Sequence, residues 1–287
     1  MSGRRGGSDG LLELLHEPRL SRVVGARDAL TALLAQEAGF DATWVSSLEV
    51  SAGRGFPDLG LLTMTECLDA ADEVARAAPL PTLVDCDTGY GGPLNVARTV
   101  RAFEDRRIAG ICLEDKVFPK RNSFLPGDQV LAEPEEFARD IEVACRCRTT
   151  DEFTVVARTE ALIAGRPLEE ALSRAHLYAD AGADAILIHS KSTSPREVCA
   201  FLGLWRQRLP VVVVPTTYNQ WHVDEAAAAG VSMVIYANHM VRACVSAMRS
   251  VLARIVQDGR SVDAERDIAS VTEIFEITRL AEWETGR

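Results

Sequence analysis

The chain has 287 residues, of which 47% are hydrophobic and 25% charged, and this composition is typical of a soluble globular protein. Its formal net charge is −11, and no Lys/Arg cluster lies outside short loops, which argues against a nucleic-acid partner. No apolar run reaches the roughly 18 residues needed to span a bilayer, so no membrane partner is expected.

The chain begins with "MSGRRGGSDG", a polar and glycine-rich stretch. It predicts a flexible N-terminal tail over residues 1–17. No Pro/Gly/Ser-rich linker divides the remainder, so residues 18–287 are predicted to form one domain.

Eight apolar runs follow the tail and alternate with segments of helical length. Four of them come after an Ala-Gly pair, as in "DAGADAILIHS", where the glycine suits the end of the preceding helix. The runs are continuous rather than alternating, as expected for strands covered on both faces. The predicted strands lie near residues 22–27, 42–47, 81–86, 110–114, 154–158, 185–189, 211–215 and 233–237.

The helical segments favour an α/β fold of the (β/α)8 TIM-barrel type. The clearest is "PLEEALSRAHLYADAG", which has an apolar stripe at helical spacing, Pro167 at its start and Gly182 beyond its end. A doubly wound open sheet is the competing fold, but "GARDAL" after the first strand lacks the expected glycine-rich turn. The C-terminal "VTEIFEITRLAEW" predicts one further helix that packs on a neighbouring subunit.

Acidic residues gather where the strands are predicted to end, which is where the chemistry of such barrels takes place. Asp85 and Asp87 flank Cys86 after one apolar run, and Glu114 and Asp115 end the next. Neighbouring carboxylates repel one another unless a cation lies between them. Since Mg²⁺ often takes few direct carboxylates and keeps several waters, these acids predict a Mg²⁺ site. The alternative is a set of solvated or salt-bridged acids at the barrel rim.

Residues that suit an anionic substrate end other strands. Arg158 and His189 end the fifth and sixth, and they suit a phosphate or carboxylate dianion, although each alone is often structural. Ser46 and Ser47, at the end of the second, offer hydroxyl and backbone N–H groups to a carboxylate. Trp44 precedes them and could equally be a core residue.

The stretch "EDKVFPKRNSF", residues 114–124, follows the fourth predicted strand. It contains Lys116 and Lys120, two of the three lysines in a chain whose other basic residues are arginines; the third is Lys191. A lysine retained among so many arginines indicates a site that needs a compact ammonium group.

The strings "DCDTGYGG", "EDKVFPKRNSF", "VVARTEALIAG", "GADAILIHSK" and "GVSMVIYANH" resemble the isocitrate lyase/phosphoenolpyruvate mutase superfamily, and within it most closely the phosphoenolpyruvate mutases. The resemblance runs from about Arg22 to Phe275. It implies a barrel whose eighth helix is exchanged between subunits, in a homotetramer built as a dimer of dimers.

The resemblance also implies a set of site residues. Asp85 would bind Mg²⁺ directly, while Asp58, Asp87 and Glu114 hold its waters. Substrate contacts would come from Trp44, Ser46, Ser47, Asn122, Ser123, Arg158 and His189. Catalytic roles would fall to Asp58, Lys120, Asn122, Arg158 and His189.

Within this resemblance, residues 114–124 form a mobile lid that brings Lys120 and Asn122 over the substrate and excludes water. Lyases of the superfamily tend to carry the pattern K-x-C-G-H at this position. This chain has "KRNSF" instead and lacks the proton-donating cysteine. Phosphonopyruvate hydrolases tend to carry threonine near Asn122. Two departures are Ser47, where glycine is frequent, and Phe124, where leucine is commoner.

The expected activity is therefore the interconversion of phosphoenolpyruvate and 3-phosphonopyruvate, the first step of phosphonate biosynthesis, followed by a downstream enzyme that consumes phosphonopyruvate. The alternatives are phosphonopyruvate hydrolysis, carbon–carbon cleavage of a 2-hydroxy acid, and a non-catalytic scaffold barrel. The seven cysteines lack zinc-site spacing and fit a reducing cytoplasm, the expected location.

Overall fold

The computed structural model describes residues 10–286 and contains eight parallel strands in a closed barrel. The strand order follows the chain, and β1 pairs with β8 to close the barrel. This confirms the predicted barrel and excludes the open sheet, and every predicted strand lies within two residues of an observed one. The strands are β1 (Ser21–Gly25), β2 (Ala42–Val45), β3 (Thr82–Asp85), β4 (Gly110–Glu114), β5 (Thr154–Thr159), β6 (Ala185–Ile188), β7 (Val211–Val213) and β8 (Met233–Tyr236).

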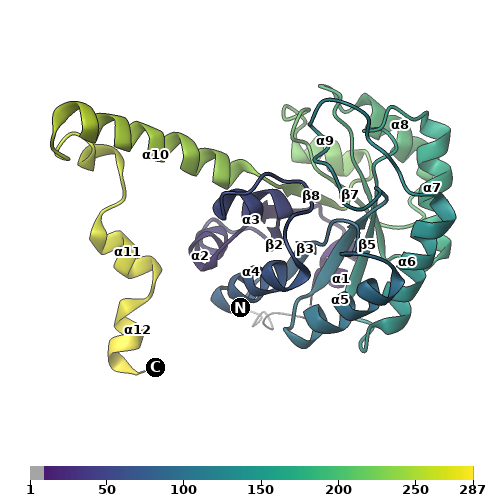
Figure 1. Ribbon diagram of the computed structural model, residues 1–287, viewed down its shortest axis with the longest axis horizontal. Helices are drawn as coiled ribbons and strands as arrows, with labels where there is room; N and C mark the ends of the chain where they lie inside the picture. Colours follow the sequence, from purple (N-terminus) through teal and green to yellow (C-terminus); the bar gives the residue numbers. More distant parts are fainter. Residues whose placement is uncertain (1–9, 287) are drawn as a thin grey trace.

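Helices connect successive strands and surround the barrel (Figure 1). Within residues 10–286, none is long and apolar enough to cross a membrane. Pro167 and Gly182 flank α7 as predicted. The helices of the barrel are α1 (Leu11–His16), α2 (Ala29–Glu37), α3 (Ser47–Gly53), α4 (Met64–Ala77), α5 (Pro93–Asp105), α6 (Pro134–Cys147), α7 (Leu168–Asp180), α8 (Arg196–Trp205) and α9 (Val223–Ala228).

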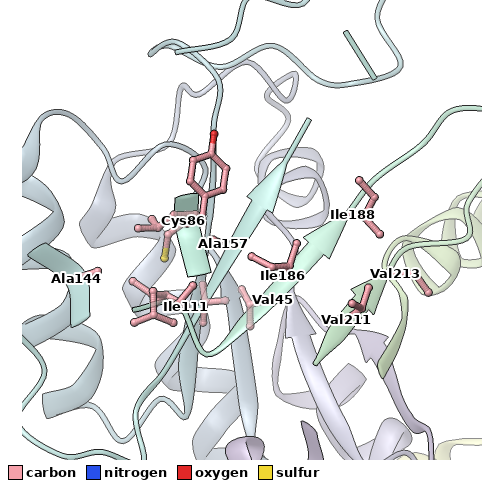
Figure 2. Close-up of a cluster of buried hydrophobic side chains, with 14 of the residues drawn as sticks. Val45, Cys86, Ile111, Ala144, Ala157, Ile186, Ile188, Val211 and Val213 are labelled. Atoms are coloured by element: carbon pink, nitrogen blue, oxygen red, sulfur yellow. The ribbon is translucent and has the colours of Figure 1, made fainter. Parts of the chain in front are cut away.

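Alternate residues of each strand enter two different cores. One set faces the helices: Ile186 and Ile188 on β6, for example, lie with Val211 and Val213 on β7 (Figure 2). The intervening residues, such as Leu187, fill the barrel interior. Both faces are therefore apolar, which explains the continuous hydrophobic runs in the sequence.

α1 closes the barrel interior at the amino ends of the strands. This helix lies within the segment that was predicted to be a flexible tail. Residues 1–9 lie outside the described part of the chain, but Leu11, Leu14 and Leu15 are buried in the same core as the interior strand residues. The Ser21 hydroxyl donates to the carbonyl oxygen of Leu14 at 3.0 Å. The prediction of a tail over residues 1–17 was wrong for this helix, because its three leucines share one helical face and cover the amino ends of the strands.

The C-terminal part of the chain leaves the barrel as an arm, defined here as residues 239–285 (Figure 1). It comprises α10 (His239–Asp258), a 3₁₀ turn η1 (Glu265–Asp267), α11 (Val271–Ile277) and α12 (Leu280–Thr285). The single helix predicted at the end was wrong, because Arg279 has a left-handed φ of 57° that separates α11 from α12. Against the described residues, α10 buries only Val241.

Glu49 joins the barrel mouth to the first turn of the arm. It is 1% exposed, and its Oε1 accepts a hydrogen bond from the backbone N–H of Val241 at 3.2 Å. Its Oε2 has no hydrogen-bond partner among the described residues. Burial raises the pKa of Glu49 to about 7, although the Val241 N–H and the charge of Arg27 oppose the rise and Asp28 adds to it.

Replacing Glu49 with glutamine should change how stability depends on pH. The folded protein holds the Glu49 proton more tightly than the unfolded chain, whose pKa is near 4.5. The contribution of this group to stability is therefore full below pH 4.5 and declines as the pH rises towards 7. At pH 8, Glu49→Gln should be more stable than the natural protein by roughly 1–3 kcal/mol, with no gain at pH 4.5. Urea denaturation at both pH values checks this, and an equal effect at both would contradict it.

Candidate active site

A small cavity lies at the carboxyl ends of the strands and has a volume of about 50 Å³. A larger groove of about 720 Å³ is lined by residues 75–79 and 105–107, directly before β3 and β4. That groove is at the amino ends of the strands, where such barrels carry stability rather than catalysis. The cavity is lined by Trp44, Ser46, Leu48, Asp58, Asp85, Lys120, Asn122, Ser123, Phe124, Arg158, His189, Val214, Thr216, Ala237 and Asn238.

Lys120 places an ammonium group among the acids of this cavity. Its Nζ lies 2.8 Å from Asp58 Oδ1 and 2.9 Å from Asp87 Oδ1, and it donates to the Ser47 hydroxyl at 2.8 Å. Burial would lower the pKa of Lys120, but Asp87 and Asp58 hold it well above its ordinary value. The ammonium therefore stays charged and ties the loop after β4 to residues that follow β2 and β3.

The turn after β3 brings its two aspartates to the cavity side of the barrel. Asp87 adopts a left-handed φ of 48°, and Gly89 follows with φ of 86°. A Cβ on Gly89 would lie 2.6 Å from Val96 Cγ2, so glycine lets this turn pack closely against α5. The peptide N–H of Asp87 approaches Asp85 Oδ1 at 3.4 Å. Burial raises the pKa of Asp87 to about 6 despite the opposing charge of Lys120.

Ser47, one of the departures noted in the sequence, uses its hydroxyl as a bridge. It donates to Asp85 Oδ2 at 3.0 Å while it accepts from Lys120 at 2.8 Å. The Ser47 hydroxyl is thus engaged with two site residues.

Asn122 and Phe124 cover one side of the cavity. The Asn122 amide donates to Asp58 Oδ2 at 2.6 Å, and its oxygen accepts from the peptide N–H of Phe124 at 2.9 Å. The Phe124 ring meets the His189 ring edge-on, with centroids 5.8 Å apart. The loop carrying these residues is therefore held over the strand ends by both polar and aromatic contacts.

Arg158 and His189 project from the ends of the neighbouring strands β5 and β6. Arg158 Nη2 lies 3.4 Å from Glu114 Oε2 and 2.9 Å from His189 Nδ1. Burial lowers the pKa of His189, against the opposing effect of Glu160. His189 Nε2 is buried and has no hydrogen-bond partner among residues 10–286, and His189 lines the cavity. The Arg158 guanidinium can bind an anionic group directly, and His189 Nε2 can donate to the same group when the imidazole is protonated.

Comparison with known proteins identifies the family. A model described as "Phosphoenolpyruvate phosphomutase" matches residues 11–256. The chain belongs to the phosphoenolpyruvate phosphomutase family. It is 45% identical to the phosphoenolpyruvate phosphomutase of Tetrahymena pyriformis, over 93% of this chain and 89% of that protein.

Solved structures of family relatives agree over nearly the whole barrel and arm. The phosphoenolpyruvate phosphomutase of Streptomyces platensis subsp. rosaceus has a TM-score of 0.94 at 47% identity, covering 96% of both chains. A phosphonopyruvate hydrolase in complex with oxalate and Mg²⁺ has a TM-score of 0.90 at 39% identity, covering 96% of this chain and 95% of that one. The chain is thus an enzyme of the phosphoenolpyruvate mutase superfamily, with both mutases and a hydrolase among its relatives.

The structure brings together all the residues that the sequence predicted for this phosphomutase-family site. Most line the cavity. The others touch residues that line it: Ser47 and Asp87 contact Lys120, and Glu114 contacts Arg158. Of the three lysines, Lys116 and Lys120 are buried here, whereas Lys191 is exposed. The individual roles of the predicted site residues are still predictions.

The acids of this site suit one hard dication. Mg²⁺ often takes few direct carboxylates and keeps several waters. Among residues 10–286, no group of three acids, histidines or cysteines is placed to hold an ion directly. Glu114 Oε1 is buried without a hydrogen-bond partner in the described chain, and burial raises the pKa of Glu114 to about 7 despite Lys116 and Arg158. A nearby dication would compensate such buried carboxylate oxygens.

Two acids near the site differ from expectation. Asp115, grouped with the rim acids by its position, instead faces α7: its Oδ2 accepts from the Tyr178 hydroxyl at 2.8 Å and lies 3.3 Å from Arg174 Nη1. Glu160 was not selected from the sequence, yet it contacts Arg158 and His189. Its only sequence signal was its position two residues after Arg158, at the end of β5.

Proposed function

We propose that this enzyme is a phosphoenolpyruvate mutase, which interconverts phosphoenolpyruvate and 3-phosphonopyruvate. The observation that carries the proposal is the engagement of Asp58 by two donors, Lys120 Nζ at 2.8 Å and Asn122 Nδ2 at 2.6 Å. A carboxylate held in this way is a poor base for activating water. Asn122, Phe124 and the small volume of the cavity also favour exclusion of water. Hydrolysis would need a water molecule in this cavity.

In the proposed reaction the phosphorus–oxygen bond of phosphoenolpyruvate breaks first, giving pyruvate enolate and a metaphosphate-like PO₃ fragment. The enolate C3 then attacks phosphorus to form the carbon–phosphorus bond, so no net proton transfer is needed. Arg158, His189 and Asn122 hold the fragment, while Ser46 and the Ser47 backbone orient the carboxylate. A loose transition state of this kind depends on positioning and charge stabilisation rather than on a strong nucleophile.

The alternative route makes Asp58 a transient nucleophile that carries the phosphoryl group. Burial raises the pKa of Asp58, but Lys120 and Asn122 outweigh this and hold the pKa below its ordinary value. Donors that stabilise the carboxylate also reduce its nucleophilicity. The contacts therefore favour Asp58 as the residue that positions Lys120 and Asn122.

The decisive test of the reaction follows phosphorus by ³¹P NMR after the natural protein is mixed with phosphonopyruvate and Mg²⁺. Formation of phosphoenolpyruvate supports the mutase. Inorganic phosphate as the product would identify a phosphonopyruvate hydrolase instead, the activity named for one relative. Carbon–carbon cleavage of a 2-hydroxy acid is disfavoured, because "KRNSF" lacks the cysteine that donates a proton in the lyases.

Replacing either Asn122 or its hydrogen-bond partner Asp58 with alanine should slow the reaction. Asn122→Ala and Asp58→Ala should each lower kcat by about 10²–10³-fold, because each removes charge stabilisation or positioning in the cavity. Circular dichroism should show that both variants fold. Arg121→Ala is the matched control: Arg121 is an exposed neighbour on the same loop, and its guanidinium donates to the Pro126 carbonyl at 3.2 Å, away from the cavity residues. The kcat of this variant should be unchanged. Turnover near that of the natural protein in Asn122→Ala would contradict the role of Asn122.

We also propose that the enzyme uses Mg²⁺, with Asp85 as its direct ligand and Asp58, Asp87 and Glu114 around its waters. When bound, the ion would stabilise negative charge on the enolate oxygen.

Binding of Mg²⁺ can be measured without turnover by titration calorimetry. Asp85→Asn should abolish detectable binding, and Glu114→Gln should weaken it about 10–100-fold, as expected for a residue that acts through the water shell. Asp151→Asn, which changes an exposed acid, is the control. Unchanged affinity in Asp85→Asn would exclude this ligand assignment.

The arm supports a proposal about assembly. Val245, Met248, Leu252 and Ile255 recur every three or four residues along α10, Val256 follows Ile255, and all five are exposed. α11 and α12 add Phe275 and Trp283, which are 47% and 81% exposed. Such an apolar surface favours burial against another copy of the chain. We propose a dimer in which the two chains exchange this helix, and a tetramer formed from two such dimers.

We also propose a downstream enzyme that consumes phosphonopyruvate.

Charge introduced on the stripe of α10 should break this assembly. Leu252→Glu should reduce the molar mass measured by light scattering from that of a tetramer to a smaller species. Leu94→Glu changes a leucine that is 88% exposed on α5 and should leave the mass unchanged. A monomeric natural protein, or a tetrameric Leu252→Glu, would contradict the proposed use of the arm.

A further inference from the structure

Glu160 is a completely buried carboxylate, and its two oxygens serve different parts of the site. It stands directly after β5, and its own peptide N–H donates to Asp115 Oδ1 at 2.7 Å. Since Asp115 is itself braced by α7, the backbone at Glu160 is fixed from behind. The side chain is thus held rigidly between the barrel and the loop after β4.

One oxygen, Oε1, contacts the residues proposed to hold the phosphoryl group. Arg158 Nε donates to it at 2.6 Å, and His189 Nδ1 lies 2.8 Å away. Because this carboxylate oxygen can only accept, the contact favours a proton on His189 Nδ1. The hydrogens of Arg158 Nη2 then turn to Ser123 Oγ at 3.2 Å and Glu114 Oε2 at 3.4 Å. Oε1 therefore sets the orientation of both the guanidinium and the imidazole.

The other oxygen, Oε2, contacts only residues from the 114–124 stretch among those described. The Ser123 hydroxyl donates to it at 2.5 Å, and Lys116 Nζ lies 2.9 Å away. Lys116 Nζ also donates to the Arg121 carbonyl at 2.9 Å and to Ser123 Oγ at 2.8 Å. Two side chains of the stretch thus contact Oε2, and Lys116 links a third point, the Arg121 carbonyl, to them. The same stretch carries Lys120 and Asn122 into the cavity.

We infer that Glu160 is a positioning residue that couples closure of the loop to the arrangement of the phosphoryl-binding side chains. When Ser123 and Lys116 contact Oε2, the carboxylate is fixed in the orientation in which Oε1 holds Arg158 and His189. If the loop opens, Glu160 loses its contacts with Ser123 and Lys116. Its carboxylate then no longer holds Arg158 and His189 in a fixed orientation. The arrangement competent for phosphoryl transfer is then assembled only under a closed loop.

A purely structural role is the alternative, and it predicts a different result. A carboxylate that only neutralises Arg158 and Lys116 would affect folding stability when removed, but would not link the loop to turnover. The two roles are therefore distinguished by measuring loop opening and catalysis on the same variants. Arg121 provides the probe, since it is an exposed tryptic site on this stretch, and cleavage there requires the loop to open locally.

The experiment uses Glu160→Gln, which keeps the shape of the side chain but removes its charge. With oxalate and Mg²⁺ present, the rate of tryptic cleavage after Arg121 should rise about 10-fold or more, because two charge-assisted contacts to Oε2 are weakened. The kcat for consumption of phosphonopyruvate should fall about 10²–10³-fold. Glu170→Gln is the matched control: Glu170 also accepts from an arginine Nε, that of Arg174 at 3.0 Å, but on α7 outside the cavity. It should change neither quantity.

Ser123→Ala tests the same coupling by a smaller change and covers the case in which Glu160→Gln does not fold. It removes one loop contact to Oε2 and should raise the cleavage rate and lower kcat together. In the double variant the two effects on cleavage should add to less than their sum, since both act through one contact. A variant whose kcat falls while its cleavage rate stays unchanged would overturn the coupling, as would unchanged kcat in Glu160→Gln.

The inference rests on the proposed function only for its description of the transferred group. If the natural protein released inorganic phosphate from phosphonopyruvate, the mutase proposal would fail. The coupling would still be judged by the cleavage rate and by the kcat for phosphonopyruvate consumption, which do not depend on the identity of the product.

Discussion

Negative charge buried at the ends of β3 and β4 is the constraint on which the rest of the site depends. Asp85, Asp87 and Glu114 are each less than 10% exposed, and an unpaired buried carboxylate costs several kcal/mol. The protein offsets this with cations that come from elsewhere in the chain. Lys120 arrives on the loop after β4 and Arg158 stands at the end of β5. The fold and the chemistry are therefore linked by the need to balance these charges.

The loop after β4 serves three acids of the site through two lysines. Lys120 contacts Asp58 and Asp87, and Lys116 contacts Glu160. Removal of Lys120 would leave Asp87 without an ion-pair partner among residues 10–286, and removal of Lys116 would take one of its cations from Glu160. The loop is therefore energetically part of the site rather than a cover added to it. This explains why compact ammonium groups are found here in a chain that otherwise uses arginine.

Most of the barrel was predictable, because strands covered on both faces give continuous apolar runs, as at β6 and β7. The shared location of Asp85, Arg158 and His189 was also predictable, since these residues directly follow such runs or end them. Glu160 was missed because its importance comes from contacts with residues far apart in the sequence. The packing of α1 and the break at Arg279 were missed because one depends on the open end of the barrel and the other on a single left-handed residue.

Lys120 neutralises Asp58 and Asp87 in this structure, and the proposed Mg²⁺ site is beside Asp85. A crystal structure of the protein with Mg²⁺ and oxalate tests this most directly. The account predicts an ion next to Asp85, with Lys120 Nζ still within ion-pair distance of both other aspartates. An ion lying between Asp58 and Asp87, with Lys120 turned out to solvent, would contradict it.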